Sequence, residues 1–314
     1  MITPKDKKFY MPAEWHTHEN CWMQWPHYNQ NFNSYGDIPT WSFFDIDKAH
    51  VAWSNVAKSI AKFEKVKMIV NSDDINKASE LLNNKNIEII KFNNDDCWAR
   101  DSGSIFLLNH KNELGGVDWE FNGWGKFKPF DSDNKIAKMM IDSNQAYYFK
   151  NNMILEGGSI HVDGQGTLIT TEQCLLNKNR NPNFTKEEIE FNLREFLGVS
   201  KIIWLKYGID EGTDGHIDNV ACFIKPGVVM ALSCLNKNDP FYEKLNENIE
   251  VLKTSVDVNN KYLKVIPVEM SYKRHIKNSY EPSSYINFYM ANNSIIMPSF
   301  NDERSDIKAQ QIIQ

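Results

Sequence analysis

The most constraining feature of this sequence is a repeated order of structural elements. Residues 153–171, 216–233 and 285–299 each have the pattern of two apolar strands joined by a turn. The turns fall near positions 164, 226 and 292, so they are 62 and 66 residues apart. A helical pattern and then a strand follow the first two hairpins, at 185–205 and 240–270. Repetition at a fixed period indicates a fold in which each unit contributes one sector.

The same order is visible earlier in the chain and is incomplete at its end. Strands at 103–109 and 117–121, a helix at 134–143 and a strand at 146–149 form a plausible further unit, and residues 43–90 alternate helices and strands. The last hairpin is followed by a helical pattern at 306–314 but by no closing strand. We therefore predict an α/β fold of hairpin-helix-strand repeats whose last repeat is incomplete. An ordinary alternating α/β protein is the alternative.

Composition favours one soluble domain. The chain has 314 residues, 41% of them hydrophobic and 24% charged, and no Gly/Ser-rich linker divides it. The polar stretch 271–284 has the composition of a surface loop. The net charge of −6 without a basic block argues against nucleic acid and membrane partners, and no apolar stretch approaches a membrane span. Five scattered cysteines without a CxxC motif favour a reducing, cytoplasmic setting.

The stretch TDGHIDN at 213–219 places Asp214, His216 and Asp218 at alternate positions. It runs into the apolar, β-rich VACFIKPGVVMALS, which predicts a strand with all three side chains on one face. Two explanations remain open for this pattern. Oxygen and nitrogen donors suit Zn, Mn or Fe, whereas paired carboxylates also suit a planar guanidinium, with the imidazole left for proton transfer.

Three other polar clusters accompany this stretch. DDCWARDSGS at 95–104 has an ordinary interpretation as a surface turn with an ion pair between Arg100 and Asp101. LEGGS at 155–159 places Glu156 in an apolar strand, where a carboxylate needs a partner, beside glycines that permit close approach. His16 and His18 in WHTHE form an H-x-H pair, for which we prefer a solvated N-terminal segment over a metal site.

Six segments together resemble the agmatine deiminases of the bacterial-type peptidylarginine deiminase family, within the guanidine-modifying superfamily. In order along nearly the whole chain, they are MPAEWHTHENCWMQWP, DCWARDSGSI, FNGWGKF, LEGGSIHVDGQGTLITTEQCLLNKNRNP, DGHIDNVACFIKPGVV and YINFYMANNSIIMPSF. The resemblance implies the pentein fold, a pseudo-fivefold α/β propeller around a central site. It also implies that the reaction needs no metal and no cofactor, which leaves a metal-dependent hydrolase as a minor alternative.

The resemblance assigns roles to four residues of this chain. Asp96 and Asp218 match the carboxylates that clamp the guanidinium, His216 matches the general acid/base, and Glu156 matches the carboxylate that orients substrate and histidine. Asp214 is expected only to shape the entrance of the strand. Four tryptophans are expected to pack in the core or to line the approach of an aliphatic amine: Trp22, Trp25, Trp98 and Trp124.

The family's nucleophile is a cysteine in a segment of the form GGG-x-I-H-C-x-T, which this sequence does not contain. Cys97 is expected to point away from Asp96 on a strand. Cys222 is expected about 20 Å along a strand from His216. We therefore expect a single domain, residues 1–314, that lacks the nucleophile segment and has no nucleophilic cysteine of its own.

The reaction expected from the resemblance is hydrolysis of agmatine to N-carbamoylputrescine and ammonia, as part of putrescine and polyamine metabolism. In full-length relatives it is expected to pass through a covalent amidino-cysteine intermediate, and the activity of residues 1–314 is left open because the nucleophilic cysteine is absent. One alternative is a C-terminally truncated, non-catalytic protein that only binds guanidino or amine ligands. A lesser alternative is a peptidylarginine deiminase. The expected partner is a small cation, and a homo-oligomer is compatible with the sequence.

Overall fold

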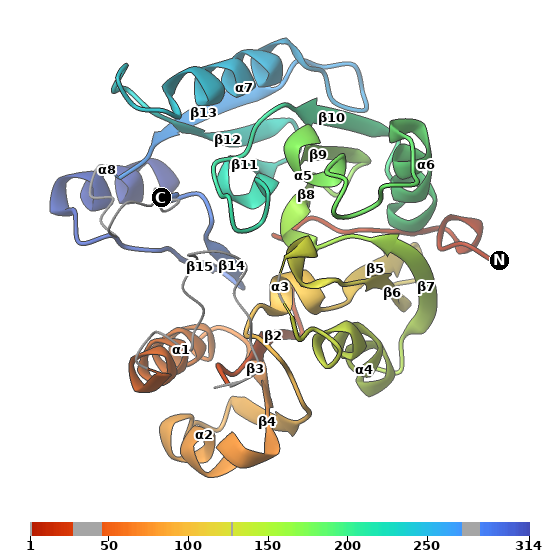
Figure 1. Ribbon diagram of the computed structural model, residues 1–314, viewed down its shortest axis with the longest axis vertical. Coiled ribbons are helices and arrows are strands. Elements are labelled where there is room, and N and C mark those ends of the chain that lie inside the picture. Colours follow the sequence, from red (N-terminus) through yellow and green to blue (C-terminus); the bar gives the residue numbers. More distant parts are fainter. Residues whose placement is uncertain (1, 28–45, 127, 272–282) are drawn as a thin grey trace.

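The computed structural model describes residues 2–27, 46–126, 128–271 and 283–314. Most of the loop predicted at 271–284, and the start of the helix predicted at 43–63, lie outside the described residues. Figure 1 shows the sheets and their helices arranged as sectors around a common centre. Five separate sheets make up this arrangement in the described ranges. The predicted fivefold α/β architecture of the pentein fold is therefore confirmed.

The first sector is a parallel sheet rather than a hairpin unit. Its strands lie in the order β2 (Asn20–Gln24), β3 (Lys65–Val70) and β4 (Ile87–Lys91), and both pairings are parallel. The helices α1 (Ile46–Ile60) and α2 (Ile75–Leu81) make the two connections between these strands. Parallel neighbours require such crossovers, which explains the alternating pattern of residues 43–90.

The next three sectors confirm the predicted repeat. Each has an antiparallel hairpin, then a helix, then a strand that pairs in parallel with the second hairpin strand. The short β1 (Phe9–Tyr10) extends the first of these sheets by pairing with β5. The elements are β5 (Ile105–Asn109), β6 (Leu114–Glu120), α4 (Ile136–Ser143) and β7 (Tyr147–Ile154); β8 (Ile160–Val162), β9 (Thr167–Thr171), α6 (Lys186–Leu197) and β10 (Lys201–Leu205); and β11 (Ala221–Lys225), β12 (Val228–Ser233), α7 (Tyr242–Thr254) and β13 (Lys264–Glu269).

The last sector contains the hairpin of β14 (Tyr289–Ala291) and β15 (Ser294–Ile296), followed by α8 (Glu303–Ile313). Within the described part of the chain this sheet has two strands. The hairpin turns at Asn293, whose φ is +60°. Asparagine is one of the few residues other than glycine that adopt this left-handed conformation at low cost.

Local sequence explains where the helices begin and end, as α6 illustrates. The Thr185 side chain accepts a hydrogen bond from the Glu188 N–H, and the Glu188 carboxylate accepts one from the Thr185 N–H. This capping box satisfies donors that the first turn would leave unpaired. Gly198, with φ +67°, then ends the helix in the left-handed conformation that glycine adopts without strain. The residue types at both ends of α6 therefore determine its length.

The elements that position the candidate site are short and lie near the centre of the fold. They are α3 (Ala99–Ser102), α5 (Glu172–Leu175), and the 3₁₀ turns η5 (Gly157–Ser159) and η6 (Ile217–Asn219). η5 contacts both α3 and η6, although the three come from different sectors. Figure 1 shows α3 and α5 near the middle of the molecule, inside the ring of sheets.

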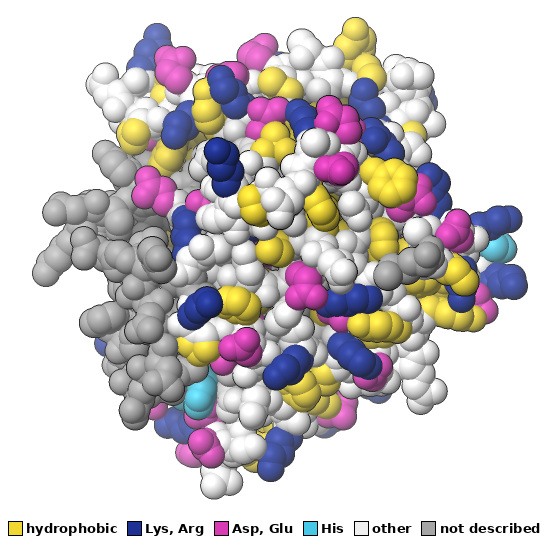
Figure 2. All heavy atoms as spheres, turned by 45° about the vertical axis from the view of Figure 1, so that its right-hand side comes forward, with side chains coloured by type: hydrophobic (Ala, Val, Ile, Leu, Met, Phe, Trp, Pro, Cys, Tyr) yellow, Lys and Arg dark blue, Asp and Glu magenta, His cyan; other side chains and the backbone are white. Residues whose placement is uncertain are grey.

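The outer surface has mixed charge. On the face in Figure 2, Lys and Arg side chains are interspersed with Asp and Glu side chains and with single hydrophobic groups. A search of the described residues for membrane-spanning helices found none that is both long and apolar enough.

Candidate active site

The stretch 213–219 is a tight turn, not the predicted strand. Asp214 and Gly215 have φ values of +57° and +86°, and the Gly215 N–H donates to the Asp210 carbonyl across 2.7 Å. Successive residues with positive φ cannot continue a strand. η6 follows at once, and β11 begins only at Ala221. The prediction that three alternate side chains share one strand face was therefore wrong, and so was the metal arrangement that depended on it.

The Asp214 carboxylate binds two cationic side chains and not His216. Its Oδ2 lies 2.5 Å from Arg180 Nη1 and accepts a hydrogen bond from Asn179, and its Oδ1 lies 2.7 Å from Lys126 Nζ. Burial alone would raise the pKa of Asp214, but these donors hold it below its usual value. Asp214 is thus an ionised anchor for Arg180, a role that the sequence did not predict.

Arg180 links this anchor to Glu156. Its Nε donates to Glu156 Oε1 across 2.6 Å, and both side chains are completely buried. A third contact, from Nη2 to the Thr213 carbonyl at 3.1 Å, fixes the plane of the guanidinium. Glu156 is not inside a strand as predicted, because β7 ends at Ile154 and Glu156 precedes η5. The sequence predicted that this carboxylate needs a partner, and the structure shows that the partner is Arg180.

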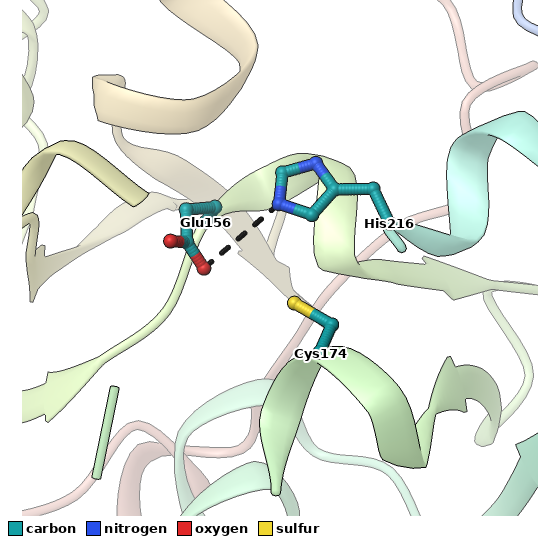
Figure 3. A group of neighbouring side chains, drawn as sticks. All are labelled: Glu156, Cys174 and His216. Atoms are coloured by element: carbon teal, nitrogen blue, oxygen red, sulfur yellow. Dashed lines mark ion pairs between the residues drawn. The ribbon is translucent and has the colours of Figure 1, made fainter. Parts of the chain in front are cut away.

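The second oxygen of Glu156 faces His216. Glu156 Oε2 and His216 Nε2 are 4.0 Å apart, and both atoms are buried without a hydrogen-bond partner. Figure 3 shows the imidazole and the carboxylate pointing toward each other, with the Cys174 thiol close to both. Buried polar atoms without partners are rare in folded proteins and are expected where a ligand supplies the missing contact.

Asp101 lies on the other side of the imidazole. Its Oδ1 is 3.7 Å from His216 Nδ1 and accepts a hydrogen bond from the Gly158 N–H at 3.0 Å. Its Oδ2 accepts one from Trp124 Nε1 at 2.9 Å. The interpretation of Asp101 as part of a surface ion pair was wrong, because the side chain is buried and Arg100 instead binds Glu14. The imidazole is thus flanked by a carboxylate near each ring nitrogen.

Gly158 allows these groups to approach. A Cβ at this position would lie 2.5 Å from His216 Nδ1, 2.6 Å from Asp218 Oδ2 and 2.8 Å from Asp101 Oδ1. These contacts are far shorter than atoms tolerate. The glycine therefore allows the Asp218 carboxylate to lie beside the imidazole.

Burial shifts the pKa values of His216, directly before η6, and of Asp218 within it. Loss of hydration lowers the pKa of His216 to about 4, so the imidazole is neutral at pH 7. Burial, and then the charge of Asp101, raise the pKa of Asp218 well above its usual value. Burial and the neighbouring carboxylate thus favour the protonated form of Asp218, and a nearby cation favours its ionised form.

Asp96 lies on the loop that leads into α3. Its N–H donates to Asp133 Oδ2 at 3.0 Å, its carbonyl accepts from Gln24 at 2.8 Å, and its Oδ1 accepts from the Cys97 N–H at 2.7 Å. The side chain is buried. These contacts fix the loop rigidly, while the role of Asp96 as the second clamping carboxylate stays a prediction.

The aromatic and histidine predictions had mixed outcomes. Trp25 and Trp124 are buried, whereas Trp98, directly before α3, is 45% exposed. His16 is exposed as expected. His18 is not simply solvated, because its Nδ1 lies 3.3 Å from the buried Glu64 and its backbone pairs with the Asn292 side chain. This contact joins the first sector to the last hairpin.

All five cysteines are free and buried. Burial raises the pKa of each thiol for which a shift is resolved, to about 12 for Cys21 and also upward for Cys97, Cys174 and Cys222. A thiolate rather than a thiol is the nucleophile, so none of these shifts favours attack. Sequence reasoning considered Cys97 and Cys222 beside the site but missed Cys174, which is the cysteine next to Glu156 and His216.

Comparison with known proteins identifies the family to which this chain is similar. Residues 10–314 match the family described as Porphyromonas-type peptidyl-arginine deiminase. A relative from Legionella pneumophila (strain Paris) is 45% identical over 311 residues, which cover 98% of this chain and 87% of the relative. An agmatine deiminase of Pseudomonas aeruginosa (strain LESB58) is 38% identical over 343 residues, with coverage of 99% and 89%.

A solved structure extends the likeness to three dimensions. The agmatine deiminase of Enterococcus faecalis superimposes on this chain with a TM-score of 0.89 at 34% sequence identity. The match covers all of this chain and 90% of that protein. Likeness of fold and sequence over such lengths includes every element that forms the site described above.

Proposed function

Since the chain belongs to the Porphyromonas-type peptidyl-arginine deiminase family, we propose that its buried site binds agmatine and belongs to an agmatine deiminase. The reaction consumes agmatine and water and yields N-carbamoylputrescine and ammonia, and its product lies on the route to putrescine. One observation carries the proposal. Asp218, Glu156 and Asp101 surround a neutral imidazole, and Asp218 Oδ1, Glu156 Oε2 and His216 Nε2 are buried without partners.

A planar cation fits this electrostatic environment. Burial and the charge of Asp101 raise the pKa of Asp218 and favour its protonated form, whereas a bound guanidinium would favour the carboxylate and provide the missing donor. A neutral His216 adds no positive charge that would repel the substrate. In the proposed roles, Asp218 and Asp96 hold the guanidinium from two sides, and Glu156, fixed by Arg180, orients it against His216.

The proposed chemistry needs one proton carrier. In the family's reaction a thiol attacks the guanidinium carbon as its proton passes to the histidine, here His216, and the imidazolium then gives that proton to the departing ammonia; none of the five cysteines of residues 1–314 is assigned the role of that thiol. Water, deprotonated by His216, next attacks the amidino-thioether, and the thiol leaves with the proton returned. The depressed pKa keeps His216 in the neutral form that can accept a proton at pH 7.

A second candidate function is binding of guanidino or amine ligands without turnover. It is favoured by the thiols, since burial raises every cysteine pKa that is resolved and so disfavours the thiolate. Removal of a nucleophile from a cooperating set commonly lowers turnover about a million-fold. The name of the Pseudomonas relative favours agmatine over peptidyl-arginine for either function.

Two measurements on the purified 1–314 chain separate these candidates. Calorimetry with agmatine tests binding, and detection of ammonia and of the ureido product tests turnover. Both functions require that the chain binds agmatine and that His216→Asn and Asp218→Asn weaken this binding. Absence of any agmatine binding at millimolar concentration would overturn both. Turnover abolished by a single Cys→Ser change, at Cys21, Cys97, Cys174, Cys222 or Cys234, would identify the nucleophile and establish the enzyme.

A further inference from the structure

Cys174 lies in the candidate site, yet the proposed reaction gives it no part. The thiol comes from α5, whose start is fixed by the Thr171 side chain accepting from the Cys174 N–H. Its Sγ and one atom each of Glu156 and His216 all lie within 4.8 Å of one another. Figure 3 shows the three side chains converging from three separate segments of the backbone. All three residues are buried.

Two of these three donor atoms are unsatisfied. Glu156 Oε2 and His216 Nε2 are buried without hydrogen-bond partners, 4.0 Å apart. A buried polar atom without a partner is unfavourable, so a group that binds both atoms at once is favoured. A hydrogen-bond donor can satisfy the two acceptor atoms, and a metal ion would bind both of them together with the adjacent sulfur.

A thiolate, an imidazole and a carboxylate form the set of ligands that Zn²⁺ prefers, whereas Mg²⁺ and Ca²⁺ prefer oxygen alone. We propose that Glu156, Cys174 and His216 form an inhibitory Zn²⁺ site, with a water molecule as the fourth ligand. The ion is a reversible inhibitor in this proposal and takes no part in the deiminase reaction.

The distances permit this geometry with small side-chain movements. Bonds of about 2.0–2.3 Å in a tetrahedral site place neighbouring ligand atoms about 3.4–3.7 Å apart. The 4.0 Å separation of Glu156 Oε2 and His216 Nε2 is close to this value, and the sulfur lies within 4.8 Å of both. Rotation of the side chains by about 1 Å at their ends therefore completes the site.

The charges also balance. Binding replaces the thiol proton, which leaves for solvent, by a Zn–S bond. Arg180 stays on the opposite oxygen of Glu156, where Asp214 neutralises it. Such a buried partner that orients a ligating carboxylate is typical of metal sites. The ion binds His216 Nε2 and Glu156 Oε2, which are the atoms that face the guanidinium in the proposed function. It therefore competes with the guanidinium, and this one step rests on the proposed function.

Metal binding is measured on the purified 1–314 chain without reference to turnover. Zn²⁺ titration with a competing chromophoric chelator should give one ion per chain, and Co²⁺ in its place should show a thiolate-to-metal charge-transfer band. Cys174→Ser should remove the band and lower Zn²⁺ affinity by about 100-fold or more, because even loss of an outer partner costs 10- to 100-fold. Glu156→Gln should lower the affinity as well.

Cys234→Ala is the matched control, because Cys234 is equally buried but packs in the core formed around β11–β13. It should bind Zn²⁺ like the unchanged chain. Unaltered affinity in Cys174→Ser, or no stoichiometric binding by a folded chain, would overturn the proposal. Agmatine should weaken Zn²⁺ binding competitively. If Zn²⁺ binds through Cys174 while agmatine does not bind at all, the metal site stands and the proposed function fails.

Discussion

Arg180 Nε lies 2.6 Å from Glu156 Oε1, and neither side chain has any exposure to solvent. The same guanidinium also forms an ion pair with Asp214, which in turn binds Lys126. Acidic and basic groups thus alternate along a chain that leads from Lys126 to the Glu156 oxygen facing His216. The arrangement explains why a carboxylate can be held in the interior of this fold with one oxygen left for a ligand.

Replacement of Arg180 by Met should destabilise the protein by about 3–5 kcal/mol, because Glu156 becomes a buried charge without a partner. The free energy of unfolding, measured by urea denaturation, tests this expectation. Adding Glu156→Gln to Arg180→Met should recover part of the loss, because the second change removes the orphaned charge.

Arg194→Met is the control for this experiment. Arg194 also binds a glutamate, Glu190, at 2.7 Å, but the two side chains are 39% and 21% exposed on α6. A solvated pair of this kind contributes about 0–1 kcal/mol. If Arg180→Met and Arg194→Met lower the free energy of unfolding equally, the buried pair contributes no more to stability than the exposed one.

Binding of agmatine should release a proton from Asp218. Burial and the charge of Asp101 raise the pKa of Asp218, and a bound cation favours its ionised form. Agmatine affinity should therefore increase as pH rises toward the raised pKa, by up to tenfold per pH unit. Calorimetry in two buffers with different ionisation enthalpies measures the number of protons released.

The clamp itself is tested by Asp218→Asn and Asp96→Asn. A charge-assisted hydrogen bond contributes about 1.5–3 kcal/mol, so each change should weaken agmatine binding by about 10- to 150-fold. Asp218→Asn should also abolish the proton release. Wild-type affinity in Asp96→Asn would remove Asp96 from the clamp and leave Asp218 as its carboxylate.

His216 should make the fold less stable in acid. Its pKa is about 4 in the folded chain against an ordinary value of 6.5, so the unfolded chain binds the proton more tightly. The contribution is complete above pH 6.5 and is lost as pH falls toward 4, and it amounts to about 3 kcal/mol. Comparison with His216→Asn at pH 7.5 and 4.5 tests it, because the variant lacks the imidazole that titrates in this range. If the free energy of unfolding changes equally with pH in both proteins, the depressed pKa is not a property of His216.

The repeat was predictable because hairpin turns and helical periodicity are local signals. Gly164, Pro226-Gly227 and Asn292-Asn293 mark the turns in the sequence, and their hairpins are β8–β9, β11–β12 and β14–β15. The grouping of Glu156, His216 and Asp218 came from similarity of motifs, and the structure brings these three residues together.

What failed was the local geometry of 213–219 and the choice of partners. Thr-Asp-Gly is a sequence typical of turns, and attention to it would have prevented the prediction of a strand. The partners of the site residues are a different matter. Arg180 is 24 residues from Glu156 and Asp101 is 57 residues from Gly158, so only tertiary packing brings the members of each pair together. No periodicity reports such contacts. The same holds for Cys174.

Gly158→Ala should disrupt the site, because the added methyl group would meet three of its side chains. The added Cβ would lie 2.5 Å from His216 Nδ1 and 2.6 Å from Asp218 Oδ2, so both groups must move. Overpacking of this kind typically costs about 1–3 kcal/mol of stability. We also expect agmatine binding to be lost, because displacement of Asp218 removes one side of the clamp. Thermal unfolding and calorimetry measure the two effects.

Gly212→Ala provides the comparison, because it adds the same methyl group close to the site without the same collision. Its Cβ would lie 3.2 Å from Asp210 Oδ1, the end of a side chain that can turn aside, and no second residue is approached. Gly212→Ala should therefore bind agmatine like the unchanged chain. If both variants bind agmatine equally well, Gly158 does not set the approach of His216 and Asp218. If only Gly158→Ala fails while remaining folded, the glycine of η5 determines the geometry of the guanidinium site.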